Sequence, residues 1–103
     1  NDDASAGRHK GPGRPLQPAA ERAEILASLA CVDYVTLFPE DTAAETLREL
    51  QPRIHAKGGD YRPERIPADE QRAAQELGIR LVLAGGDKVG SSSELVRRLG
   101  ELA

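Results

Sequence analysis

The stretch Lys57-Gly58-Gly59-Asp60-Tyr61 (KGGDY) decides how this chain is interpreted. It follows a short strand-like run at 53–56 and ends it abruptly. Two consecutive glycines permit a sharp turn and let another group approach the backbone closely. In an α/β sheet, ligands bind beyond the carboxyl ends of the strands. The turn is therefore a candidate ligand loop, although an ordinary charged surface turn has the same composition.

Helical and strand-like segments alternate around this turn. Runs rich in β-branched, aromatic or other apolar residues predict three strands, at 32–38, 53–56 and 79–84. Apolar residues at helical spacing predict four helices, at 18–30, 42–50, 69–77 and 91–102. This alternation predicts an α/β fold with a parallel sheet and right-handed crossovers.

Local signals define where several of these helices begin and end. Thr42 and Glu45 have the spacing of a capping box, and Ser91 and Glu94 repeat it. Gly78 stands where a left-handed residue commonly ends a helix. We therefore expect Thr42 and Ser91 to cap their helices.

Residues 1–16 are polar and contain glycine, proline and a cluster of basic side chains. We expect a loop here and not a regular helix, because glycine and proline both disfavour one. The loop is either a solvated tail or a segment whose cations meet phosphate. Its basic residues are Arg8, His9, Lys10 and Arg14.

Composition limits the class of protein. The 103 residues allow one domain, and a net charge of −3 gives no basic field for nucleic acid. The single Cys31 cannot form an internal disulfide, and we expect it to be a small buried residue of a reduced, cytoplasmic protein. His9 and His55 lack metal-ligand spacing, so we predict no histidine metal site. No run approaches the about 20 apolar residues of a membrane span, and no signal peptide is visible.

Three features would meet at the carboxyl ends of the predicted strands. They are the basic loop with Lys10 and Arg14, the KGGDY turn, and the serine-rich start of the last helix. A helix N-terminus offers free N–H groups and a partial positive charge to phosphate. Ser91 alone could simply be a cap, but Ser91-Ser92-Ser93 exceeds what capping requires. The combination suits a polyphosphate ligand with a divalent cation.

The order and spacing of the motifs resemble one family. The motifs are Lys10-Gly-Pro-Gly-Arg-Pro15, Arg22, Val32-Asp-Tyr-Val35, Phe38, Glu40-Asp-Thr42, KGGDY and Ser91-Ser-Ser93. Together they resemble the adenylyltransferase domain of the heptose-phosphate kinase/heptose 1-phosphate adenylyltransferases (ADP-heptose synthases), within the cytidylyltransferase-like nucleotidyltransferases. The resemblance covers almost the whole chain.

This resemblance implies a Rossmann-like α/β fold and the transfer of AMP from ATP to D-glycero-β-D-manno-heptose 1-phosphate, with Mg²⁺. It implies a catalytic role near the triphosphate for Lys10 and a substrate-binding role for Arg14, and it assigns no residue to metal binding. The nucleotide-binding residues carried over by position are Arg22, Lys57, Gly58, Gly59, Asp60, Tyr61, Ser91, Ser92 and Ser93.

The chain also departs from the family pattern. The family's catalytic His-x-Gly-His motif lies in its first strand–helix unit, and no such motif occurs here. Thr42-Ala43 replaces Thr-Pro, Pro67-Ala68 replaces a glycine, and His55-Ala56 replaces two apolar strand residues. We therefore expect residues 1–103 to be the C-terminal part of a single nucleotidyltransferase domain that lacks its first strand–helix–strand unit and is inactive alone.

Two alternatives stay open for the function. One is a sibling enzyme that uses another nucleotide or another phosphorylated alcohol. The other is a non-catalytic fragment that binds nucleotide. The expected partners are a nucleotide and a sugar phosphate, and both a homodimer and a kinase domain fused upstream stay open.

Overall fold

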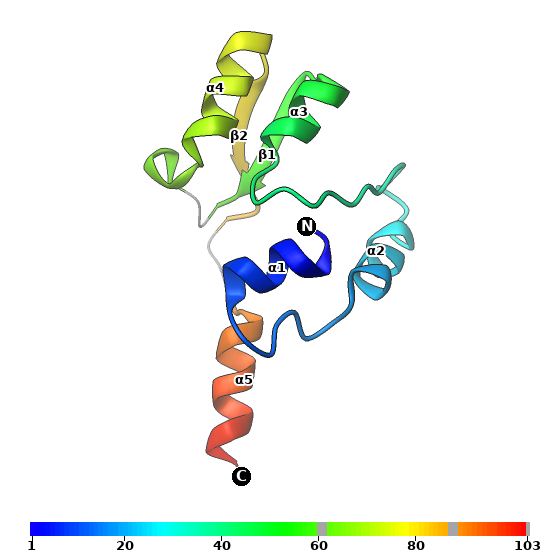
Figure 1. The fold of residues 1–103 in the computed structure, drawn as a ribbon, viewed down its shortest axis with the longest axis vertical. Helices are drawn as coiled ribbons and strands as arrows, with labels where there is room; N and C mark the ends of the chain where they lie inside the picture. Colours follow the sequence, from blue (N-terminus) through cyan, green and yellow to red (C-terminus); the bar gives the residue numbers. More distant parts are fainter. Residues whose placement is uncertain (60–61, 87–88, 103) are drawn as a thin grey trace. The chain divides into compact units, whose positions relative to one another are not determined.

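The computed structural model describes residues 1–59, 62–86 and 89–102, so Asp60 and Tyr61 of the KGGDY turn lie outside the described residues. The chain divides into two compact units, Asn1–Leu50 and Gln51–Ala103, and each is described by itself (Figure 1). None of the helices in the described ranges has the length and apolarity that a membrane span needs.

The second unit is built on two parallel strands. β1 (Ile54–Gly58) pairs with β2 (Arg80–Ala84) in a register that runs from Ile54 opposite Arg80 to Gly58 opposite Ala84. Parallel neighbours need a crossover connection, and here a 3₁₀ turn, η1 (Pro63–Arg65), and the helix α4 (Ala68–Leu77) supply it (Figure 1). The predicted parallel pairing is confirmed, and the observed elements are compatible with an incomplete α/β fold.

Helix α4 is held by its C-terminal turn and its buried face. Gly78 adopts φ +68°, and the N–H of Ile79 donates to the carbonyl of Ala74 at 2.8 Å, as predicted for a glycine that ends a helix. Ala73, Ala74 and Ile79 are buried, and Ile66 is buried just before the helix. Small side chains on α4 therefore form much of this unit's apolar interior.

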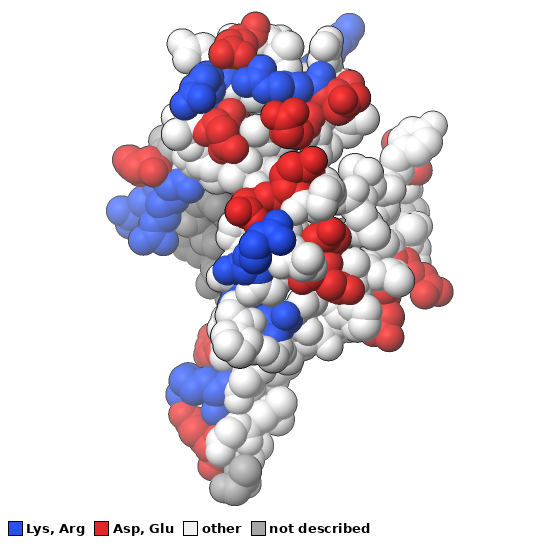
Figure 2. All heavy atoms as spheres, viewed as in Figure 1, with Lys and Arg blue, Asp and Glu red and all other residues white. Residues whose placement is uncertain are grey.

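Helix α5 (Ser92–Glu101) begins as predicted but does not bury its apolar face. The hydroxyl of Ser91 accepts the N–H of Glu94 at 3.1 Å, which confirms Ser91 as the cap. In Figure 2, α5 presents charged side chains along one edge and uncharged ones along the other. Its apolar residues are exposed, by 54% at Leu95, 42% at Val96 and 57% at Leu99, and Leu102 at its C-terminal cap is 83% exposed.

The first unit opens with a helix where a loop was predicted. α1 (Asp3–Lys10) is capped by Asp2, whose Oδ1 accepts the N–H of Ser5 at 2.9 Å. This hydrogen bond from the Ser5 N–H holds the pKa of Asp2 below its ordinary value. The prediction was wrong because the prolines and all but one of the glycines of residues 1–16 come only at Gly11 and beyond, where α1 has ended.

Helices α2 (Ala19–Ala27) and α3 (Ala44–Leu50) complete the first unit, close to their predicted positions. α3 begins later than Thr42 because the carbonyl of Ala43 accepts the first helical N–H, from Leu47 at 2.9 Å. Gln51, with φ +47°, stands just after the helix, ahead of a proline that cannot continue it. Leu47 is buried, whereas Leu50 is 66% exposed.

The predicted strand at 32–38 is wrong. Within the described ranges, β1 and β2 pair only with each other, and a strand needs a neighbour to complete its hydrogen bonds. The segment instead runs as irregular chain, and the carbonyl of Phe38 accepts the N–H of Asp2 at 2.9 Å. Cys31, expected to be buried, is exposed. Ile25 and Leu29, two of the apolar residues whose spacing predicted a helix at 18–30, are about half exposed, at 53% and 48%.

Candidate functional site

The residues that the sequence assigned to one site belong to both units. Lys10, Arg14 and Arg22 lie in the first unit, and the KGGDY turn and Ser91–Ser93 lie in the second. The convergence of these two sets stays a prediction. Each set has its own geometry, and that geometry separates the residues that hold the fold from those that could receive a ligand.

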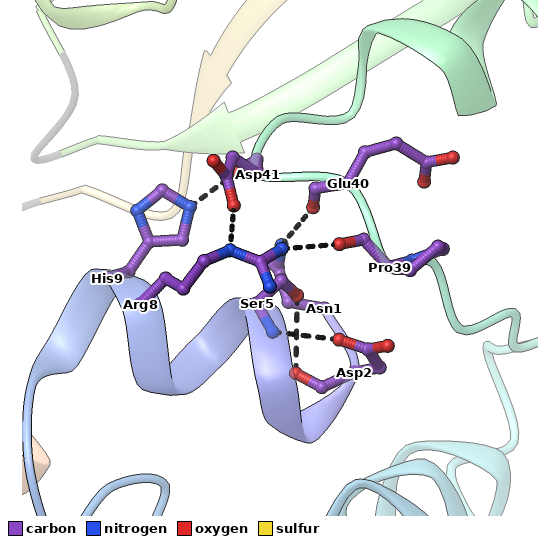
Figure 3. A network of polar contacts seen from close by, with 8 residues as sticks. All are labelled: Asn1, Asp2, Ser5, Arg8, His9, Pro39, Glu40 and Asp41. Carbon is purple, nitrogen blue, oxygen red and sulfur yellow. Dashed lines mark hydrogen bonds and ion pairs between the residues drawn. The ribbon is translucent and has the colours of Figure 1, made fainter.

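In the first unit, α1 holds the Pro39–Asp41 segment through side chains (Figure 3). The Nε of Arg8 lies 2.7 Å from Oδ1 of Asp41, and its Nη2 donates to the carbonyl of Pro39 at 2.7 Å. The Nε2 of His9 donates to the carbonyl of Asp41 at 2.6 Å, which places the ring proton on that nitrogen. Two basic side chains of the segment predicted to be a loop therefore bind to another part of the same chain.

Lys10 and Arg14 lie beyond this network. Lys10 is exposed at the end of α1, where a cation also suits the negative end of the helix dipole. Arg14 is half-buried, and its Nε is enclosed with no hydrogen-bond partner among the described residues. An enclosed donor without an acceptor is costly, so an anionic group at Arg14 would satisfy it.

Arg22 connects α2 to the start of α1. Its guanidinium donates to the carbonyls of Gln17 at 3.0 Å and Asn1 at 3.1 Å, and Nη2 lies 3.3 Å from Oδ1 of Asp3. The same carboxylate oxygen accepts the N–H of Ala19 at 2.8 Å. These contacts give Arg22 a structural role that the sequence did not indicate, because its partners are loop carbonyls and a residue on another helix.

A groove of about 300 Å³ also lies in the first unit, formed by residues 36–40 and α3. Its lining includes the carboxylates of Glu40, Glu45 and Glu49. Carboxylates repel phosphate at close range, so this groove is a poor site for a nucleotide.

In the second unit, the turns that follow the two strands pack backbone against backbone. Gly58 is the last residue of β1 and pairs with Ala84, the last of β2. A Cβ on Gly59 would lie only 2.2 Å from the carbonyl oxygen of Gly86. The close approach that a glycine permits at this position is thus made by the neighbouring turn.

Lys57 projects from β1 into a charged cluster. Its Nζ lies 2.8 Å from Oε2 of Glu70 on α4, and Nε2 of His55 lies 3.8 Å from the same oxygen. The side chains are 17% exposed at Lys57, 16% at His55 and 2% at Glu70. The ammonium that was assigned to the nucleotide therefore faces a buried carboxylate.

Sequence reasoning missed Glu70, although one signal was available. Glu70 shares the spacing i, i+3, i+4 with Ala73 and Ala74, so it lies on the stripe of α4 that is buried. A single acidic residue near a helix start is more often a favourable charge at the helix dipole. Only the burial of the stripe separates these two roles.

The serines at the start of α5 divide into two kinds. Ser91 uses its hydroxyl as the helix cap. Ser92 and Ser93 lie in the first helical turn with exposed side chains. Their hydroxyls and the N–H groups of this ten-residue helix could receive phosphate oxygens.

The described residues offer no cluster of side chains that would hold a metal ion. Within the described ranges, no three His, Cys, Asp or Glu side chains come together as a metal site would require. Mg²⁺ commonly binds through substrate phosphates, water and one or two carboxylates.

Comparison with known proteins gives a consistent result. No protein-family model matches the chain. It is 44% identical to the bifunctional protein HldE of Pelobacter propionicus and 44% identical to that of Streptomyces coelicolor, each over 98% of the chain and about a fifth of the relative, at 20% and 21%. It is 54% identical to the bifunctional protein HldE of Geotalea uraniireducens over 68% of the chain and 14% of the relative.

The chain thus corresponds to a limited part of much longer relatives, but nearly all of it aligns with that part. The motifs that suggested a family and the aligned relatives agree. The chain therefore belongs to the family of the bifunctional HldE proteins, in agreement with the resemblance that its motifs indicated.

Proposed function

We propose that this chain contributes nucleotide-binding parts to an adenylyltransferase that transfers AMP from ATP to D-glycero-β-D-manno-heptose 1-phosphate. The observation that carries the proposal is the alignment of nearly the whole chain with HldE proteins at 44% identity. Supporting it, the KGGDY turn begins at the carboxyl end of a parallel strand, which is where α/β folds bind ligands. A Rossmann-like arrangement of the intact domain is part of the same proposal.

The proposed reaction is a displacement at phosphorus. A phosphate oxygen of the sugar phosphate attacks the α-phosphorus of ATP and forms the new P–O bond. The bond from the α-phosphorus to the oxygen that bridges to the β-phosphorus breaks, and pyrophosphate leaves with that electron pair. Such reactions depend on positioning the substrates and on neutralising negative charge, so we expect cationic side chains and helix N–H groups to bind the phosphates.

Specific residues of this chain would supply these phosphate-binding groups. Lys10 would neutralise charge at the triphosphate. The enclosed Nε of Arg14, which has no acceptor among the described residues, would bind the sugar phosphate. Ser92, Ser93 and the N–H groups at the start of α5 would hold phosphate oxygens. Bound Mg²⁺ would neutralise phosphate charge.

The name of the relatives, bifunctional protein, is in keeping with a fused kinase domain elsewhere in the protein. Two other functions differ in their expected results. A sibling enzyme would bind another nucleotide or act on another phosphorylated alcohol. A non-catalytic segment would bind nucleotide without forming product.

The test uses the protein as its gene encodes it. Calorimetry measures binding of MgATP, and a product assay measures ADP-heptose and pyrophosphate. Lys10→Ala should lower kcat by about 10²- to 10³-fold, the usual cost of removing one electrostatic contact to the transition state. Arg72→Ala, which removes an exposed cation from α4, is the matched control and should leave kcat unchanged. Nucleotide binding without product, or an equal response to both variants, would contradict the proposal.

A further inference from the structure

The carboxylate of Glu70 lies in the interior of the second unit, where a charge is expensive. Glu70 is 1% exposed and stands in the first turn of α4. Removing a carboxylate from water costs several kcal/mol, roughly, unless a cation and hydrogen bonds compensate it. The N-terminal turn of a helix offers partial compensation. A buried carboxylate of this kind needs a cationic partner, and its cost indicates that the pair has a role in the fold or the function.

Lys57 is that partner, and its position in the chain indicates the reason. Its Nζ lies 2.8 Å from Oε2 of Glu70, and it immediately precedes Gly58 and Gly59. His55, two residues earlier, points to the same face of β1 because side chains alternate along a strand, and its Nε2 lies 3.8 Å from the same oxygen. Glu70 thus meets the helix-covered face of β1 at its carboxyl end.

The ion pair fixes the end of β1 relative to the start of α4. Beyond it, the backbone at Gly59 fits against Gly86 with no room for a Cβ. The direction of the backbone at Gly58–Gly59 is therefore set by two contacts, the buried ion pair of Lys57 with Glu70 and the approach of Gly86 to Gly59. A change in either should alter where the N–H groups of the turn point.

We propose that Glu70 is a positioning residue for nucleotide binding, acting through Lys57 on the Gly58–Gly59 turn. Lys57 then supports the turn from inside the fold, and the backbone of the turn meets the nucleotide. This inference rests on the proposed function. The competing arrangement has Lys57 leaving Glu70 to bind phosphate directly.

The two arrangements predict opposite effects for Glu70→Gln. If Glu70 positions the turn, the neutral amide loosens Lys57 and weakens nucleotide binding. If Lys57 binds phosphate itself, the same change releases its ammonium from a competing carboxylate, and binding stays equal or becomes tighter. Lys57→Met weakens binding in both arrangements and serves as the reference.

The experiment is calorimetric titration of the protein as its gene encodes it with MgATP. We expect Glu70→Gln to raise Kd at least tenfold, with the number of binding sites unchanged. Glu64→Gln is the matched control, because it removes an exposed carboxylate from η1, and its Kd should equal that of the wild type. A purely structural role would instead lower the number of sites, by reducing the folded fraction, at an unchanged Kd.

The outcomes are distinct. If the wild type binds no MgATP, the proposed function and this inference both fail. If the wild type binds and Glu70→Gln keeps its Kd, binds more tightly, or only loses sites, this inference alone fails. If Glu70→Gln does not fold, Glu70→Asp replaces it, since it keeps the charge on a shorter side chain. A raised Kd at full stoichiometry then supports the inference, and a wild-type Kd overturns it.

Discussion

Alanine at Gly59 tests whether the turns after β1 and β2 are packed backbone against backbone. The new Cβ would lie 2.2 Å from the carbonyl oxygen of Gly86 and 3.0 Å from its carbonyl carbon. Real Cβ atoms essentially never approach closer than 3.0 Å, so one turn must retreat by about 0.8 Å. Both atoms belong to the backbone, so no side-chain rotation can relieve the contact.

The size of the effect follows from two opposing contributions. Overpacking of this kind costs about 1–3 kcal/mol. Replacing glycine restricts the unfolded chain and returns about 0.4–1 kcal/mol. The net loss of about 1–2 kcal/mol corresponds to a change of about 5- to 30-fold in the opening equilibrium.

Hydrogen exchange followed by mass spectrometry measures this change in the intact protein. Amides of β1 and β2 should exchange about 5- to 30-fold faster in Gly59→Ala, while those of α1 keep their rates. Gly90→Ala is the matched control, because a Cβ there meets nothing within 4 Å. If Gly59→Ala exchanges like Gly90→Ala, the contact between the turns does not exist as described.

Three further outcomes are expected. Arg8→Ala removes the side-chain contacts that hold residues 39–41. Loss of about 1 kcal/mol should make the amides of that segment exchange about fivefold faster. Arg8→Lys should restore part of the protection. Ser91→Ala should destabilise α5 by about 0.5–2 kcal/mol, seen as lost helicity by circular dichroism, and an equal loss in Ser92→Ala would refute the capping role. Folding lowers the pKa of Asp2, so the Asp2 carboxylate stabilises α1 fully at pH values above the pKa of Asp2 in the unfolded chain. This stabilisation is lost as the pH falls through the pKa of Asp2 in the folded protein. An NMR titration that finds the pKa of Asp2 at or above its ordinary value would contradict this.

The elements that the sequence predicted well are those with local causes. Gly78 ends α4 through its own backbone conformation, and Ser91 caps α5 through a residue three positions away. The pairing of β1 with β2 followed from a strand–helix–strand pattern within one unit. Such signals lie within a few residues of what they determine.

The errors have distant causes. Arg8 and His9 were expected to be loop cations, but their side chains hold Pro39 and Asp41, and a reading of nearby residues cannot detect these partners. The 32–38 segment has the composition of a strand, but composition does not supply a neighbour with which to pair. Ile25 has helical spacing, but spacing alone does not bury a side chain.

The candidate site was also predictable only in part. Glycines and serines identified the KGGDY turn and the start of α5 by their chemistry. The same chemistry could not show that Arg22 is engaged by loop carbonyls, or that Lys57 faces Glu70. A basic residue has the same appearance in a sequence whether its partner is a phosphate or a carboxylate.

The contact of Gly59 with Gly86 couples the positions of the two turns. A displacement of Gly59 towards Gly86 is opposed by this close backbone approach. A ligand that displaces Gly59 would therefore also shift the backbone at Gly86, without a hinge or a domain movement. The two turns are coupled through one van der Waals contact between their backbones.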